Sequence, residues 1–168
     1  MKIISHRGNL EGSIPSEENN PDYIHEAMES GFDVEIDLWL HDRGLYLGHD
    51  EPQYQIDLNF LKNERLWVHA KSIKTAEFLY KQPIIHWFWH ETDKMTLTSK
   101  GYIWCFPGYS CTDCIIVDKG DHAPSYSDNI WGVCTDKPYK WRDEYAEQVL
   151  ALNAYREASE DDYHDWFE

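Results

Sequence analysis

Hydrophobic and polar residues alternate most clearly between positions 33 and 50 of the chain. Aliphatic residues alternate there with polar or amphipathic ones, namely Val34, Ile36, Leu38 and Leu40 with Glu35, Asp37, Trp39 and His41. A period of two predicts a strand and places Glu35 and Asp37 on one face. Asp42-Arg43-Gly44 predicts a turn, residues 45–47 a returning strand, and His49 at its end is thereby brought back near the acids.

The two acids on one strand face predict a bound cation. Neighbouring carboxylates repel each other, and burying them costs several kcal/mol each unless a positive charge neutralises them. Glu35 and Asp37 therefore indicate a divalent metal with oxygen ligands. A half-exposed strand with solvated acids is the alternative that the spacing leaves open.

The amino terminus adds groups that suit a phosphate. Residues 1–5 form a short apolar run that ends in His6-Arg7-Gly8. An imidazole, a guanidinium and a flexible glycine at the end of a strand suit a site that handles an oxyanion. His6 before the acid strand and His49 after it could serve as base and acid on opposite sides of a phosphorus atom.

Together these segments resemble the glycerophosphodiester phosphodiesterase family, within the phospholipase-C-like barrel phosphodiesterases. The matching segments are His6-Arg7-Gly8, Glu18-Asn19, Glu35-Ile36-Asp37, Asp42-Arg43-Gly44 with His49-Asp50, Val68-His69-Ala70-Lys71, and Gly132 to Pro138. The resemblance is dense over residues 1–50 and sparse beyond them. It implies an α/β fold, a shortened TIM-type (β/α) barrel with several helices reduced to loops, and a phosphoric diester hydrolase that cleaves a glycerophosphodiester-like substrate.

The resemblance also implies one divalent metal ion, held by Glu35, Asp37 and position 69. The family has a glutamate where this chain has His69. Magnesium or calcium is the metal that the resemblance implies, whereas an imidazole ligand shifts the preference toward manganese or zinc. Alternatively, His69 is a hydrogen-bonded histidine at a strand end and no ligand.

The remaining site residues are assigned by the same resemblance and by their positions. The candidate catalytic residues are His6, His49, Arg7 and Lys71, and the candidate substrate-binding residues are Arg7, Lys71, Glu18 and His90. Glu18 lies at the edge of the implied site, although an exposed acid beside a helix start explains it equally well. His90 follows the predicted strand 83–89, and groups at the carboxyl ends of barrel strands line the active site.

Other periodic segments complete the predicted order of elements. Asn19 or Asn20 caps a helix that Pro21 opens and Gly31 ends. The remaining helices are predicted over residues 58–65, 74–81 and 141–158, and the remaining strands over residues 66–68, 83–89, 101–108, 114–118 and 130–134. Residues 160–168 form an acidic tail that we expect to fray.

Length and composition fit one domain over residues 1–168. Of these 168 residues 42% are hydrophobic and 15% aromatic, which is far from a disordered composition. A (β/α) barrel usually needs about 250 residues, with roughly 200 as the ordinary lower bound. We therefore expect some barrel helices to be loops.

The charge balance limits the partners. The chain has 15 basic and 31 acidic residues and a net charge of -16, which argues against binding of nucleic acid or anionic lipid surfaces. A small phosphodiester substrate remains compatible with it. The sequence has no apolar run long enough to span a membrane and no signal peptide after Met1, so we expect a cytoplasmic protein. The oligomeric state is not indicated.

The four cysteines raise alternatives. Cys111 and Cys114 have CxxC spacing, and Cys105 and Cys134 could complete a structural zinc site, but the outer spacing matches no common zinc finger. Ordinary thiols are the favoured interpretation. The alternatives to a phosphodiesterase are thus a catalytically inactive phosphodiester-binding relative and a zinc-stabilised interaction module.

Overall fold

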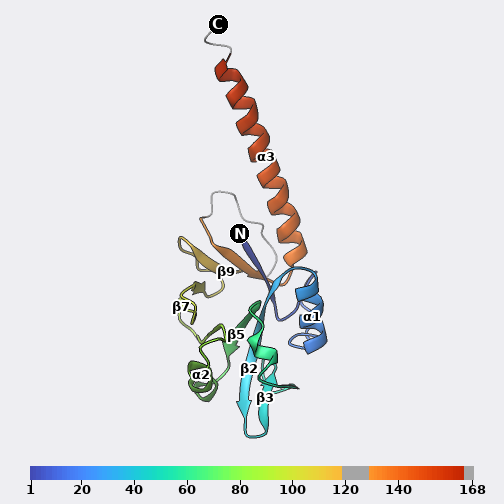
Figure 1. Ribbon diagram of the computed structural model, residues 1–168, viewed down its shortest axis with the longest axis vertical. Helices are drawn as coiled ribbons and strands as arrows, with labels where there is room; N and C mark the ends of the chain where they lie inside the picture. Colours follow the sequence, from blue (N-terminus) through green and yellow to red (C-terminus); the bar gives the residue numbers. More distant parts are fainter. Residues whose placement is uncertain (119–128, 165–168) are drawn as a thin grey trace.

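The computed structural model describes residues 1–118 and 129–164 (Figure 1). The strands are β1 (Lys2–His6), β2 (Asp33–His41), β3 (Gly44–Leu47), β4 (Tyr54–Ile56), β5 (Leu66–Ala70), β6 (Trp87–Phe88), β7 (Met95–Leu97), β8 (Ile103–Cys105), β9 (Cys114–Asp118) and β10 (Gly132–Thr135). The helices are α1 (Pro21–Glu29), the 3-10 helix η1 (Phe60–Lys62), α2 (Ile73–Tyr80) and α3 (Pro138–His164).

All the strands belong to one curled sheet of mixed direction that forms a half-barrel. Strand β1 lies between β2 and β10, parallel to both, and parallel pairing continues from β2 through β5 to β6 and from β10 through β9 to β8. Antiparallel strands are added at three places: β3 on β2, β4 on β3, and β7 on β8. The parallel strands therefore bring their carboxyl ends to one edge of the sheet.

The prediction of a TIM-type barrel is wrong. Among the described residues there are three α-helices, whereas that fold places a helix after every strand, and no ladder joins β6 to β8. The connections between β6 and β9 are too short for helices, and the one from β8 to β9 spans only residues 106–113. The sequence motifs lie at strand ends, so they carried no information on what covers the outside of the sheet.

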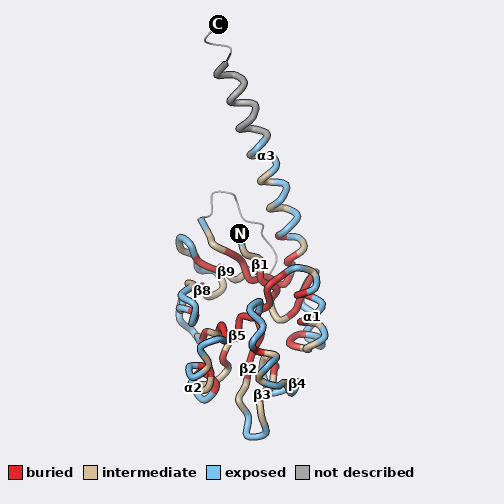
Figure 2. The backbone as a smooth tube through the Cα atoms, in the orientation of Figure 1, coloured by how far each residue is buried: buried red, intermediate tan, exposed pale blue. Residues whose placement is uncertain are grey.

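The alternation in β2 separates two chemical environments, as predicted. Val34, Ile36 and Leu38 are fully buried in an outer core that α1 and α2 cover. Glu35 and Asp37 point to the opposite, inner face of the curled sheet. Below them the inner face is filled by a second cluster, which consists of Ile4, Trp67, Phe88, Trp104, Ile115 and Cys134. The colours of Figure 2 show that burial is concentrated along these strands.

The helix predictions were partly correct. Helix α1 begins at Pro21, and Asn20 caps it by accepting a hydrogen bond from the backbone N–H of Asp22 at 3.0 Å. The predicted helix over residues 58–65 is only the short η1. Asp57 and Asn63 side chains accept backbone N–H groups in this segment, and such local hydrogen bonds compete with a regular helix.

Helix α3 starts on the body of the protein and then projects away from it (Figure 1). Trp141 is buried, and its indole N–H donates to Asp118 at 2.8 Å, while Leu150 is 69% exposed. The helix continues to His164, which includes the first part of the predicted acidic tail, and residues 165–168 lie outside the described residues. None of the described helices is both long and apolar enough to cross a membrane.

Candidate active site

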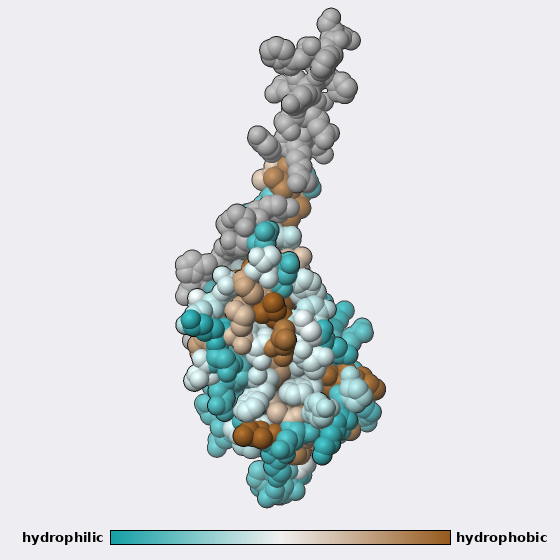
Figure 3. Space-filling view, turned by 90° about the vertical axis from the view of Figure 1, so that its left-hand side faces the viewer, coloured by the Kyte–Doolittle hydropathy of each residue, from teal (hydrophilic) through white to brown (hydrophobic). Residues whose placement is uncertain are grey.

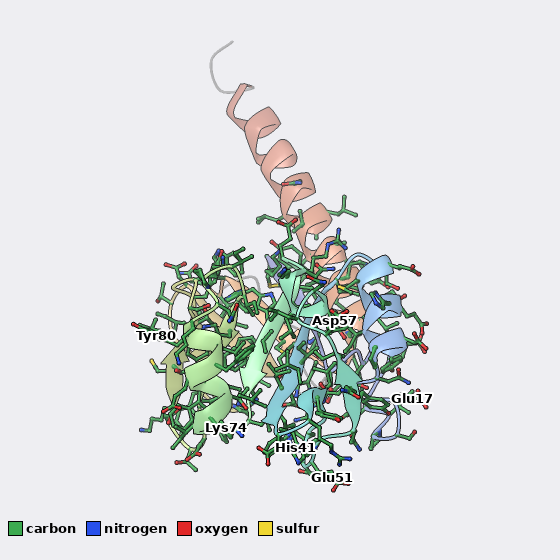
Figure 4. All side chains as sticks on the ribbon, turned by 60° about the horizontal axis from the view of Figure 1, so that its bottom comes forward. Glu17, His41, Glu51, Asp57, Lys74 and Tyr80 are labelled. Carbon is green, nitrogen blue, oxygen red and sulfur yellow. The ribbon has the colours of Figure 1, made fainter. Side chains whose placement is uncertain are left out.

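A cleft of about 680 Å³ opens at the carboxyl ends of the parallel strands. Its walls include His6, Arg7, Glu35, His49, His69 and Lys71, together with His90 and Asp136. The sheet register places His6 beside Glu35 and Asp37 beside His69. Figure 4 brings the lower end of Figure 1 forward, and the labelled, exposed side chains of His41 and Glu51 lie at the bottom of this view. The structure thus brings all the predicted catalytic residues to one cleft.

Asp37 is the most heavily bonded group of the site. One carboxylate oxygen lies 2.9 Å from Arg7 Nε and accepts a hydrogen bond from Asn19 Nδ2 at 3.0 Å. The other oxygen lies 3.1 Å from His69 Nδ1 and 3.2 Å from Lys71 Nζ. Burial opposes ionisation of Asp37, but the hydrogen bond from His69 and the charges of Arg7 and Lys71 outweigh it and hold its pKa well below the usual range. Asp37 is therefore a carboxylate in the folded protein.

Glu35 has the opposite environment. Its side chain is 3% exposed, and Oε2 has no hydrogen-bond partner among the described residues. Burial raises the pKa of Glu35, and the neighbouring Asp37 raises it further. His6 Nε2 lies 3.8 Å from the free oxygen. A buried carboxylate oxygen without a donor is costly, so Glu35 is the unsatisfied carboxylate of the site.

Glu35, Asp37 and His69 fit the ligand set of a metal ion. One donor atom from each lies within 4.8 Å of the others. His69 Nε2 lies 3.3 Å from the backbone oxygen of His90, and because a carbonyl can only accept, this nitrogen carries the proton. His69 Nδ1 then faces the carboxylates of Glu35 and Asp37. This arrangement is favourable only when a cation, either a proton or a metal ion, lies between the nitrogen and the carboxylates. Donation of the second ring N–H to a carbonyl is also the usual support of a metal-bound histidine.

His6 is held by a residue that is distant in the sequence and directly follows the neighbouring strand β10. Its Nδ1 lies 2.7 Å from Asp136 Oδ1, and the same oxygen accepts a hydrogen bond from Asn9 Nδ2 at 2.8 Å. Burial lowers the pKa of His6, but the hydrogen bond to Asp136 and the charge of Glu35 outweigh it, and the pKa is raised. Sequence reasoning missed Asp136 as a site residue. Its position directly after β10 was the available signal, since the strand ends line the cleft.

Glu18 is buried and holds Arg7. Its exposed fraction is 8%, so it is not a solvated acid beside the helix start. The carboxylate accepts hydrogen bonds from Ser13 Oγ at 2.6 Å, from Asn9 Nδ2 at 3.0 Å and from Arg7 Nη1 at 2.9 Å. Burial raises the pKa of Glu18, but these three donors lower it to about 2. Asn9 and Ser13 were also missed, because isolated polar loop residues give no periodic signal.

His49 reaches the cleft from the predicted hairpin. Strands β2 and β3 pair as expected, and the backbone N–H of Gly48 donates to the Asp37 carbonyl at 3.2 Å. The His49 side chain is 43% exposed, and its Nδ1 lies 2.7 Å from Asp50. Partial burial lowers the pKa of His49, and the positive charge of Arg7 adds to this effect. The neutral imidazole is therefore favoured at this position.

His69 and His90 lie on an aromatic floor. The His69 ring stacks on Phe88 with centroids 5.0 Å apart and an angle of 3° between the planes, and Phe88 stacks on Trp104 at 4.4 Å. Burial lowers the pKa of His90 to about 4, and the neighbouring His69 contributes in the same direction. His90 Nδ1 has no hydrogen-bond partner among the described residues. His90 is thus a neutral group that lines the cleft, and its buried Nδ1 lies 3.9 Å from the Asp93 carboxylate.

Comparisons with protein-family models, with curated proteins and with solved structures find no match to this chain. The resemblance to phosphodiesterases therefore stays a prediction, and its support has to come from the site.

Proposed function

We propose that the protein is a metal-dependent phosphodiesterase that cleaves a small, glycerophosphodiester-like substrate. The observation that carries this proposal is one cleft lined by the Glu35 carboxylate, two cationic side chains and two imidazoles, with the buried Asp37 carboxylate in contact with both cations. This combination supplies what phosphoryl transfer needs, namely positive charge around the phosphate and proton transfer at both the attacking and the leaving oxygen.

Arg7 and Lys71 would bind the phosphate. Both cations reach Asp37 and line the cleft, so their remaining N–H groups are available to phosphate oxygens. Glu18 holds one Arg7 nitrogen at 2.9 Å and thereby fixes the direction of the guanidinium group. We infer that these two side chains orient the phosphate and offset the negative charge that develops on its oxygens.

His6 and His49 would transfer the protons. Asp136 holds His6 through Nδ1, so Nε2 faces the cleft, and a carboxylate at 2.7 Å favours the imidazolium form. This suits His6 to protonate the leaving alkoxide. His49 is partly exposed and close to the charges of Arg7 and Lys71, which suits it to accept a proton from the attacking hydroxyl or water.

Glu35, Asp37 and His69 would hold the divalent ion. When bound, the ion supplies Lewis-acid stabilisation of a non-bridging phosphate oxygen. A donor set of two carboxylates and one imidazole favours manganese or zinc over magnesium or calcium. The free oxygen of Glu35 supports this assignment, because a bound cation would satisfy it.

A second candidate is binding of a phosphodiester without turnover. The observation that favours it is the environment of Asp37, whose two oxygens are already occupied by Arg7, Asn19, His69 and Lys71. A bound metal ion has to compete with these donors. Measured turnover is therefore the property that separates the two candidates.

Metal-stripped protein is assayed with bis(p-nitrophenyl) phosphate and glycerophosphocholine after restoring magnesium, calcium, manganese or zinc one at a time. We expect turnover with manganese or zinc, its loss in Asp37→Ala, and normal rates in Asp42→Ala, a control at the exposed tip of the same hairpin. Phosphorus NMR of the product distinguishes a linear monoester from a cyclic phosphate. Tight substrate binding without turnover under any ion would favour the second candidate.

A further inference from the structure

Three of the four cysteines gather at a place that is separate from the cleft. Cys105 ends β8, Cys114 begins β9, and Cys111 lies in the connection between these strands. One sulfur atom from each lies within 4.8 Å of the others, and all three are free thiols. Three thiols meet here although the chain contains only four cysteines.

The strand pattern places this cluster on the outer face of the sheet. Trp104 and Ile115 belong to the inner aromatic cluster, and neighbouring side chains of a strand point to opposite faces, so Cys105 and Cys114 point outward. Both are nevertheless fully buried. The chain turns back at Asp113, which has a left-handed φ of 59°. The backbone N–H of Asp113 donates to the Asn129 carbonyl at 2.7 Å. The connection therefore folds back to bring Cys111 onto the outer face.

Two of the three cysteines, Cys111 and Cys114, are joined by two hydrogen bonds. The backbone N–H of Cys111 donates to Cys114 Sγ at 3.2 Å, and the Cys114 thiol donates to the Cys111 carbonyl at 2.9 Å. Zn–S bonds of about 2.3 Å in a tetrahedral site put the sulfur atoms roughly 3.8 Å apart. The observed spacing of up to 4.8 Å needs a contraction of about 1 Å at most, which a loop residue such as Cys111 can provide.

We propose that Cys105, Cys111 and Cys114 bind one thiophilic divalent metal ion, with zinc as the expected ion. Each thiol that binds releases its proton to solvent, and because Cys111 is only partly buried, the fourth position is left to water or another small donor. Cys134 is not a ligand of this ion. The zinc site of four cysteines considered from the sequence is therefore corrected to a site of three. Cys134 belongs to the inner cluster with Ile4 and Trp67, on the opposite face of the sheet from Cys105.

The position of the cluster explains what a metal would do there. Among the described residues, the helices pack against β1, β2 and β5. On the side of the molecule that carries β7 and β9, hydrophobic side chains form a narrow band on the surface, flanked by hydrophilic residues (Figure 3). The β8–β9 connection contains Phe106 and Pro107, which line the cleft. A metal would tie this connection to the sheet and so stabilise one wall of the cleft.

Cobalt titration of the full chain tests the proposal. Glu35→Gln combined with Asp37→Asn removes the carboxylate ligands of the other site, so this double variant serves as the background. We expect it to bind one Co²⁺ with an intense near-ultraviolet thiolate-to-cobalt absorption, and zinc to displace the cobalt. Adding Cys111→Ser should abolish this absorption and weaken zinc binding at least tenfold, with an unchanged far-ultraviolet circular dichroism spectrum.

Two results would overturn the proposal. One is cobalt binding to the wild-type chain without any thiolate absorption. The other is a loss of two hydrogen atoms per chain by mass spectrometry, which marks a disulfide between two of these cysteines, when reduced protein is incubated with zinc and dissolved oxygen as the oxidant. Since the thiolate absorption does not depend on phosphodiester turnover, failure of this proposal is distinguishable from failure of the proposed function.

Discussion

Asn19 and Asp37 are joined by two hydrogen bonds. Asn19 Nδ2 donates to the Asp37 carboxylate at 3.0 Å, and the backbone N–H of Asp37 donates to Asn19 Oδ1 at 2.8 Å. The backbone N–H of Asn19 also donates to the Arg7 carbonyl at 3.0 Å. This residue therefore connects the loop after β1 to the acid strand, at a left-handed φ of 64°.

Replacing Asn19 by alanine should destabilise the protein by about 2–3 kcal/mol, because two buried groups of Asp37 lose their partner and alanine tolerates the left-handed backbone poorly. Urea unfolding measures the change. Asn20→Ala is the matched control, and it should cost only about 1 kcal/mol, as expected for loss of a helix cap. Asn19→Gly relieves the backbone strain alone, so recovery of full stability in that variant would contradict the role of the hydrogen bonds.

His49→Ala should lower turnover of a phosphodiester by about a hundredfold or more, because the site loses one of its proton-transfer groups. The side chain is 43% exposed, so stability should hardly change. The control is His41→Ala, which removes an exposed histidine from the same hairpin. Equal rates in the His49→Ala and wild-type proteins would rule out the assigned role.

Glu18→Gln should weaken substrate binding more than it lowers the rate at saturation, since the residue acts through Arg7. The neutral amide no longer fixes the guanidinium that lies 2.9 Å away. We expect KM to rise about tenfold with a smaller change in kcat, as for lost phosphate orientation. Glu17→Gln, at the exposed neighbouring position, is the control. A large fall in kcat with an unchanged KM would assign Glu18 a part in the chemical step.

Stability should fall as the solution is acidified from pH 6.5 to pH 4, in part because of His86. Its ring packs against Trp67 with centroids 4.1 Å apart, and Nε2 lies 2.8 Å from Thr98 Oγ1. Burial lowers the pKa of His86 from 6.5 to about 4, so the unfolded chain takes up a proton first and gains stability relative to the folded state.

The loss from His86 should reach about 3 kcal/mol once the pH is below 4. His86→Phe keeps the ring packing and removes this titration, at a cost of about 1 kcal/mol for the hydrogen bond to Thr98. Thermal unfolding at several pH values should therefore give a smaller slope in His86→Phe than in wild type, while His41→Phe leaves the slope unchanged. A slope in His86→Phe equal to that of wild type would contradict the assignment.

Local patterns predicted the strand and the hairpin beside the cleft correctly. The alternation in β2 predicted which side chains enter the outer core and which point to the inner face of the sheet. The turn at Asp42-Arg43-Gly44 predicted the hairpin that returns His49 to the cleft. These features depend on neighbours in the sequence. They could be predicted because strand periodicity and turn chemistry are properties of short segments.

The features that could not be predicted depend on distant residues. Asp136 is 130 positions from His6 in the sequence, and no pattern near either residue indicates their hydrogen bond. The half-barrel was missed for a related reason, since the motifs describe strand ends and say nothing of the coverage outside β8 and β9. The aromatic floor under His69 likewise combines Phe88 and Trp104 from separate strands.

The parallel pairing of β1 with β10 has a consequence for the order in which the protein assembles. Residues 2–5 lie beside residues 132–135, so β1 is synthesised well before the strand that completes this ladder. Such non-local pairing slows folding, since a long loop must close before the contact forms. The imidazole of His6 meets its carboxylate partner only at that late step. The nascent chain thus carries an incomplete acid–base pair until β10 has paired with β1.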